Sequence, residues 1–95
     1  MNSELDYLLK YISNDCLYDI LNNKGKYVIE LVRDARVNVC HNIEYLIKYG
    51  VTNIDHVVYE RLEELALPNN DFINNINDYE RILSKDKIIT MLENI

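Results

Sequence analysis

The sequence of 95 residues is poor in the residue types that build many active sites and stapled folds: it has two glycines, one proline, two cysteines and no tryptophan. With only Gly25 and Gly50, it contains no glycine-rich loop of the kind that holds phosphate groups. Two cysteines do not make a disulfide-rich scaffold, and the N-terminus lacks the basic and apolar segments of a secretory signal. We therefore expect a cytoplasmic protein with reduced cysteines.

Long apolar runs are also missing, and acidic residues outnumber basic ones. No stretch approaches the roughly 20 apolar residues that span a membrane, so we expect no membrane association. The 16 acidic and 10 basic residues give a net charge of −6, which disfavours direct binding to nucleic acid or anionic lipid and suits a basic protein partner. With 48% apolar and 27% charged residues, residues 1–95 have the composition of one globular domain.

What the chain does contain is a repeat of itself. Residues 5–11 (LDYLLKY) return as residues 43–49 (IEYLIKY), with identical Tyr, Leu, Lys and Tyr and conservative exchanges elsewhere. A weaker third copy begins at Asp78. Such self-similarity is typical of stacked helical units, which form binding surfaces more readily than active sites.

Apolar residues recur at steps of three and four along most of the chain, and polar breaks divide them into about six mostly short helices. Ser3, Ser13 and Ser84 stand where helix N-caps are expected. Gly25 is free to adopt the positive φ that often ends a helix, and Gly50 closes a later one. The predicted fold is all-α, a compact bundle of stacked helical hairpins.

Further signals mark the helix boundaries of the second half. Residues 52–55 (TNID) resemble a capping box with Asp55 in the place of the usual Glu. Pro68 ends the helix that follows, and Asn69 starts the next. The residues expected on the apolar faces outside the middle segment are Leu5, Leu8, Leu9, Ile12, Leu17, Ile20, Leu21, Ile54, Val57, Val58, Leu62, Leu65, Phe72, Ile76, Tyr79, Leu83, Ile88, Met91, Leu92 and Ile95.

The middle segment, residues 27–50, admits two interpretations. Residues 27–40 are rich in β-forming side chains, so a β-hairpin there stays an alternative. Helical spacing from Val28 to Leu46 matches more positions over a longer window, and no Gly or Pro interrupts it. We therefore predict one long helix, bent near Asn38.

The residues that carry catalytic or metal chemistry lack the required spacing. Cys16, Cys40, His41 and His56 form neither Cys-x-x-Cys nor His-x-x-x-His, so the sequence has no zinc signature. The three serines stand at expected helix caps and not beside a base, as a nucleophile would. We expect no catalysis, no metal and no cofactor.

Residues 43–95 share a pattern of leucines, paired valines and one glycine, at Leu46, Gly50, Val51, Val57, Val58, Arg61, Leu62, Leu65, Ala66 and Leu67. This pattern resembles the helical repeats of mitochondrial transcription termination factors. The resemblance implies stacked helical units. The family's nucleic-acid function would come with a basic face and a Pro after Arg61, where this chain has Leu62.

Residues 50–65 also resemble the helix-turn-helix unit of DNA-binding repressors, with a Gly turn, a polar cap and a helix that carries Arg61. The same helix carries four acidic residues, whereas contacts to phosphate and base edges need Arg, Lys, Asn or Gln. A packed helical hairpin is the favoured interpretation, and a helix-turn-helix DNA-binding protein is the second functional hypothesis.

The eight tyrosines are the best indication of a binding surface. Tyr7 and Tyr11, and again Tyr45 and Tyr49, lie one helical turn apart at the edge of an apolar face. Tyrosine combines apolar area with a polar tip and is common at protein interfaces, although such rings also simply flank cores.

Acidic residues on the neighbouring helix, Glu60, Glu63 and Glu64, complete this predicted partner-binding face. The favoured function is a small non-enzymatic protein-binding module, a regulator or inhibitor. Its partner would be a protein, for instance the basic surface of a nucleic-acid-binding protein. A third hypothesis is a structural subunit that forms homo-oligomers through leftover apolar surface.

The apolar spacing places Leu46 and Leu62 in the core. We expect Leu46→Ala and Leu62→Ala each to lower the free energy of unfolding by about 2–5 kcal/mol, the range for truncating a buried leucine. Urea unfolding measures this. A loss below about 1 kcal/mol would show that the position is not core.

Overall fold

The computed structural model describes residues 3–93, which fold without any β-strand. The predicted all-α bundle is confirmed, and the middle segment contains no hairpin. Seven α-helices and one short 3-10 helix, η1, follow one another along these residues. Their bounds are η1 Asp6–Lys10, α1 Asn14–Asn23, α2 Lys26–Asp34, α3 Arg36–Tyr49, α4 Ile54–Glu60, α5 Leu62–Leu65, α6 Asn69–Glu80 and α7 Lys85–Glu93.

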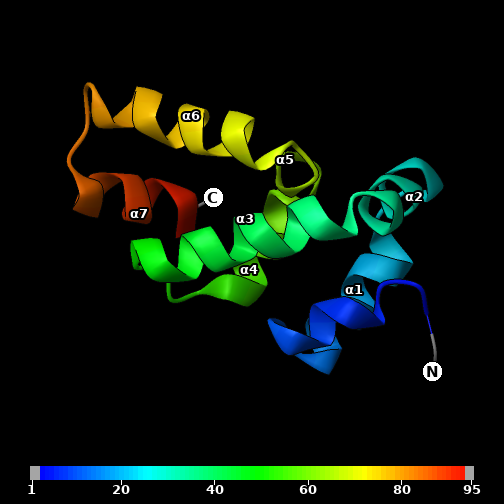
Figure 1. The fold of residues 1–95 in the computed structure, drawn as a ribbon. Coiled ribbons are helices and arrows are strands. Elements are labelled where there is room, and N and C mark those ends of the chain that lie inside the picture. Colours follow the sequence, from blue (N-terminus) through cyan, green and yellow to red (C-terminus); the bar gives the residue numbers. More distant parts are fainter. Residues whose placement is uncertain (1–2, 94–95) are drawn as a thin grey trace.

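Helix α3 runs through the middle of the bundle and contacts α2, α4, α5 and α6 (Figure 1). The bundle is elongated, with extents of 42 × 23 × 21 Å. Helices α6 and α7 form one end, and η1, α1 and α2 form the other (Figure 1). Because α3 contacts helices from both ends, it connects them.

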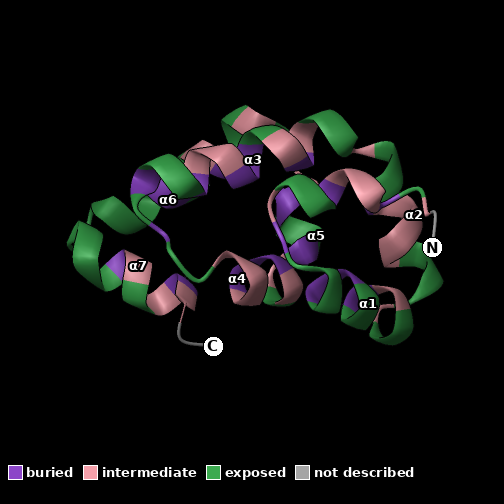
Figure 2. Cartoon of the chain, turned by 90° about the horizontal axis from the view of Figure 1, so that it is seen from below, coloured by how far each residue is buried: buried purple, intermediate pink, exposed green. Residues whose placement is uncertain are grey.

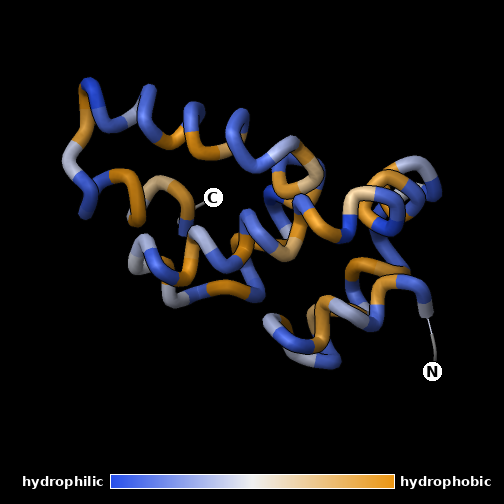
Figure 3. Tube along the Cα trace, viewed as in Figure 1, coloured by the Kyte–Doolittle hydropathy of each residue, from blue (hydrophilic) through white to orange (hydrophobic). Residues whose placement is uncertain are grey.

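The core lies between the helices, which turn their buried stripes toward one another (Figure 2). Hydrophobic and hydrophilic segments alternate along each helix, as its periodic sequence requires (Figure 3). Leu46 and Leu62 are each 1% exposed, so both predicted core positions are buried. Most of the other expected apolar positions are also buried or pack against the core, whereas Ile95 lies outside the described residues.

Leu9 and Tyr79 depart from the predicted core face, with exposed fractions of 40% and 37%. Leu9 belongs to η1, a 3-10 helix in which residues three apart align. Leu5 and Leu8 therefore share the buried side, and Leu9 turns outward. The two copies of the repeat therefore differ in conformation. Most of the first copy lies in η1, whereas residues 43–49 form the end of a regular α-helix.

The long middle helix was predicted to bend near Asn38, but the chain breaks at Ala35 into α2 and α3. Ala35 takes φ −95° and ψ 27°, and its N–H still reaches the carbonyl of Leu31 at 2.9 Å. The carbonyl of Val32, in the last turn of α2, accepts a 2.7 Å hydrogen bond from the Tyr7 hydroxyl. Carbonyls near a helix end need partners from elsewhere, so Tyr7 stabilises the break.

Several predicted caps are confirmed. The Ser13 hydroxyl accepts from the N–H of Cys16 at 3.1 Å, and the Ser84 hydroxyl accepts from the N–H of Lys87 at 3.4 Å. Gly50 ends α3 at φ 117°, a left-handed conformation that favours glycine.

Two boundary predictions are wrong at the level of individual contacts. Gly25 has φ −68° and is the N-cap of α2, so its backbone is extended and needs no positive φ. Ser3 is not the N-cap of η1, because that position belongs to Leu5. The Ser3 hydroxyl instead accepts from the N–H of Leu5 at 3.2 Å and donates to Asp6 at 2.9 Å.

The capping box predicted at residues 52–55 does not form. Asp55 accepts hydrogen bonds from the N–H and hydroxyl of Ser13 in place of its own helix end. The backbone N–H groups just before α4 are instead bound by Glu93. Its carboxylate accepts hydrogen bonds from the N–H of Thr52 at 2.7 Å and from the N–H of Asn53 at 3.2 Å. These bonds hold the pKa of Glu93 below its usual value. Helix α7 therefore caps α4 from a distance of about forty residues in sequence.

Asn42 is fully buried on α3 and is the one buried polar side chain among the described residues. Its amide nitrogen donates to the carbonyls of Leu65 at 3.0 Å and Leu67 at 2.9 Å. Its amide oxygen accepts from the side chain of Asn69 at 2.9 Å. One side chain thus satisfies the end of α5 and connects it to the start of α6.

We expect Asn42→Leu to lower the free energy of unfolding by about 2–5 kcal/mol, because it removes the partner of two carbonyls that lie against the core. Urea unfolding followed by circular dichroism measures the change. Asn77→Leu, at an exposed position of α6, is the matched control and should change stability by less than about 0.5 kcal/mol. Equal effects at the two positions would contradict the structural role of Asn42.

Candidate functional site

The four tyrosines predicted to contact a partner make contacts within the molecule. Tyr7 binds the end of α2 through Val32, and the Arg36 guanidinium lies 5.1 Å from its ring centroid. The Tyr11 hydroxyl donates to Glu44 on α3, which joins the two copies of the repeat.

The second tyrosine pair lies in the last turns of α3 and contacts α6. The rings of Tyr45 and Tyr49 stack with centroids 5.9 Å apart, and Phe72 meets Tyr45 edge-on at 6.3 Å. The Tyr49 hydroxyl donates to Glu80 at 3.2 Å, and the Lys85 ammonium lies 5.1 Å from the Tyr49 ring centroid. Tyr49 is only 9% exposed, so most of its ring is already in use.

The structure does not bring these tyrosines together with the predicted acidic residues. Glu60, Glu63 and Glu64 are exposed and line a hollow of about 180 Å³ together with Lys24 and Val28. None of the four tyrosines lines that hollow. The predicted face that combines these tyrosines with the three glutamates is therefore not supported by this hollow. Whether Tyr7, Tyr11, Tyr45 and Tyr49 bind a partner stays a prediction.

A second acidic hollow, of about 530 Å³, lies where α1 meets α4. Three carboxylates line it: Asp15 and Asp19 on α1, and Asp55 on α4. Tyr59 forms part of its wall, and His56 is the one lining residue that can become cationic. The site is held together by the hydrogen bonds of Asp55 with Ser13, of which the hydroxyl bond is 2.6 Å long.

Lys24 and Tyr59 connect the two hollows. The Lys24 ammonium lies 4.2 Å from the ring centroid of Tyr59. Tyr59 lines the larger hollow and Lys24 lines the smaller, so the two lie side by side. We call the carboxylates of both hollows the acidic face; its residues are Asp15, Asp19, Asp55, Glu60, Glu63 and Glu64.

The sequence pattern indicated only half of this face, namely Glu60, Glu63 and Glu64. Asp15 and Asp19 are one helical turn apart, a spacing that places both on one side of α1 and that could have indicated them. Asp55 and Tyr59 are likewise one turn apart on α4, but only the packing of α1 against α4 brings them to the same hollow as Asp15 and Asp19.

The cysteines and histidines form no metal-binding cluster in the described part of the chain. Among residues 3–93, no group of three or more His, Cys, Asp or Glu side chains is placed to hold a metal ion, so the absence of a metal site stays a prediction for the whole chain. The Cys16 thiol donates to the carbonyl of Asp55 at 3.3 Å, and burial raises its pKa to about 11. Such a thiol is a poor nucleophile at neutral pH.

Within the described part of the chain, no helix combines the length and the apolar character needed to cross a bilayer. Comparisons with family models, with curated protein sequences and with solved structures found no match to this chain. The resemblance of residues 43–95 to mitochondrial transcription termination factors therefore stays a prediction.

The bond between Tyr11 and Glu44 is open to a direct test. The Tyr11 hydroxyl, with smaller contributions from nearby cations, holds the pKa of Glu44 below its usual value. We expect Tyr11→Phe to raise the pKa of Glu44, which a pH titration of its carboxyl NMR signal measures. Because the pKa is lowered on folding, the pair stabilises the protein above the unfolded-state pKa and loses this effect as the pH falls. Tyr11→Phe should therefore lose less stability on acidification.

Tyr18→Phe is the control for this titration, because Tyr18 is 63% exposed. It should leave the pKa of Glu44 unchanged. A Glu44 pKa that is the same in Tyr11→Phe and in the unsubstituted protein would show that the bond is absent in solution.

Proposed function

We propose that this protein is a non-enzymatic protein-binding module whose acidic face binds a Lys- or Arg-rich segment of a protein partner. The observation that carries the proposal is the hollow between α1 and α4, which Asp15, Asp19 and Asp55 line together with Tyr59. Carboxylates and an aromatic ring together are the groups that favour a cationic side chain.

The contact between Lys24 and Tyr59 supports this chemistry. Here the protein's own ammonium group lies over the ring at 4.2 Å, within the distance at which cation–π attraction is significant. An incoming Lys or Arg side chain would meet the carboxylates of Asp15 and Asp19 in the hollow that this ring lines. The net charge of −6 adds long-range attraction for a basic partner and speeds association.

A role as regulator or inhibitor follows from the same chemistry. A basic surface that binds nucleic acid through phosphates also attracts a carboxylate-rich surface, and the two then compete. We propose a nucleic-acid-binding protein as the partner because its basic surface is opposite in charge to the acidic face.

The helix-turn-helix hypothesis gains less support from the geometry. Helix α4, Ile54–Glu60, is only 7 residues long. The guanidinium of Arg61 donates to both oxygens of Glu64, at 3.1 and 3.3 Å, and its side chain is 18% exposed. A paired and largely buried Arg61 is poorly placed to contact phosphate or bases.

The test compares two charge-reversal variants that change net charge equally. Asp15→Lys/Asp19→Lys alters the acidic face, and Asp71→Lys/Asp86→Lys alters exposed carboxylates of α6 and α7 that lie outside both acidic hollows. The probe is a peptide of alternating Lys and Ser. We expect the first variant to weaken binding about tenfold or more, mainly through the on-rate, and the control to change it much less.

Circular dichroism confirms that both variants remain folded. Equal weakening by the two variants would show that only net charge matters and would contradict a defined face. Tight, salt-sensitive binding of the unsubstituted protein to duplex DNA, abolished by Arg61→Ala, would favour the helix-turn-helix hypothesis instead.

A further inference from the structure

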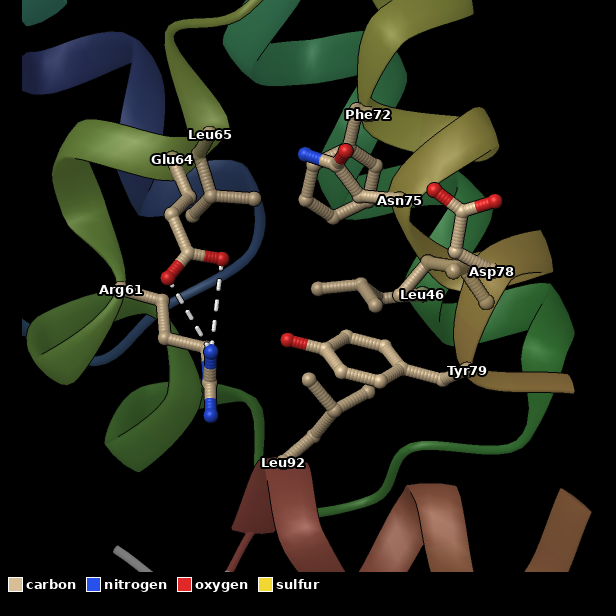
Figure 4. A pocket seen from close by; sticks show the side chains of 10 residues that line it. Leu46, Arg61, Glu64, Leu65, Phe72, Asn75, Asp78, Tyr79 and Leu92 are labelled. Carbon is tan, nitrogen blue, oxygen red and sulfur yellow. Dashed lines mark hydrogen bonds and ion pairs between the residues drawn. The ribbon is translucent and has the colours of Figure 1, made fainter. Parts of the chain in front are cut away.

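A third hollow, of about 410 Å³, opens between α5 and α6 (Figure 4). Its inner surface is apolar, and α3 and α7 each add one leucine to it. The apolar residues are Leu46, Leu65, Phe72, Ile76 and Leu92. The volume falls in the range of ligand-binding cavities, so the hollow has room for a large apolar side chain.

The two rims of this hollow are polar. Arg61 and Glu64 lie on one side, and Asn75, Asp78 and Tyr79 project from α6 on the other (Figure 4). The charge of Arg61 is balanced by Glu64, and the carboxylate of Asp78 lies 3.8 Å from the guanidinium of Arg81. The rim is therefore close to neutral, and the preference for a basic segment comes from the carboxylates of the neighbouring acidic face.

Arg61 also carries a donor that is unused in the described part of the chain. Its Nε–H is buried and has no hydrogen-bond partner among the described residues. An unpaired buried donor is unfavourable, and an acceptor that reaches it recovers free energy. A hydrocarbon offers no acceptor, whereas a peptide brings a backbone carbonyl next to each apolar side chain.

The hollow adjoins the acidic face. Arg61 and Glu64 line both this hollow and the smaller acidic one, where Glu60 and Glu63 also lie. A chain segment that places basic side chains on the acidic face therefore runs past the opening between α5 and α6.

We propose that this hollow receives one large apolar side chain, Leu or Phe, of the same basic segment that binds the acidic face. This inference rests on the proposed function, because it names the second element of the same partner. The acidic face attracts the segment, and the apolar anchor fixes its register, as buried anchors do at other protein interfaces.

The experiment uses two peptides, the alternating Lys and Ser peptide and the same peptide with one central Ser replaced by Phe. Two matched variants change the hollow or its surroundings. Asn75→Trp places a large ring at the rim, and Asn74→Trp places the same ring at the neighbouring exposed position, which does not line the hollow. Dissociation constants come from calorimetry, and methyl NMR signals of Leu46 and Leu92 report occupancy.

For the unsubstituted protein and for Asn74→Trp, we expect the Phe peptide to bind about tenfold tighter or more, the effect of burying one such side chain. This gain should disappear in Asn75→Trp, while binding of the Lys and Ser peptide stays unchanged. Only the Phe peptide should shift the signals of Leu46 and Leu92.

Three outcomes would overturn the inference. Equal affinity of the two peptides for the unsubstituted protein, with both lost in Asp15→Lys/Asp19→Lys, removes the anchor and leaves the proposed function standing. A gain that persists in Asn75→Trp without shifts at Leu46 and Leu92 places the Phe elsewhere. Binding of neither peptide to the folded protein removes the proposed function, and the inference with it.

Discussion

Helix α3 carries a fully buried amide, Asn42, into the region where α5 ends and α6 begins. The short α5 cannot satisfy its own terminal carbonyls, because a helix of four residues has almost no internal hydrogen bonds. Asn42 meets two carbonyls there and receives the side chain of Asn69. The direction in which α6 leaves α5 depends on this contact, and so does the hollow between these helices.

The tyrosines connect segments that are distant in sequence. Tyr7 satisfies the end of α2, Tyr11 binds Glu44, and Tyr49 binds Glu80. Short helices are marginally stable alone, so a chain built of them gains from side chains that pack and hydrogen-bond at once. Tyrosine does both, and Tyr7, Tyr11 and Tyr49 act in this way.

The acidic face and the apolar hollow share the wall formed by Arg61 and Glu64. Their pairing neutralises one carboxylate of the face and closes one side of the hollow. Arg61 and Glu64 thus lie on the border between the two hollows, beside the junction of α4 and α5.

The sequence alone determined the helical class, most helix ends and most of the core, because apolar spacing, Ser caps and the glycine at position 50 act over a few residues. It also indicated half of the acidic face, namely the three glutamates of residues 60–64. Only the tertiary structure decided that Asp55 binds Ser13, that Glu93 caps α4 and that Asn42 satisfies α5. These contacts join residues more than twenty positions apart, and no local pattern specifies which distant group a polar side chain will meet.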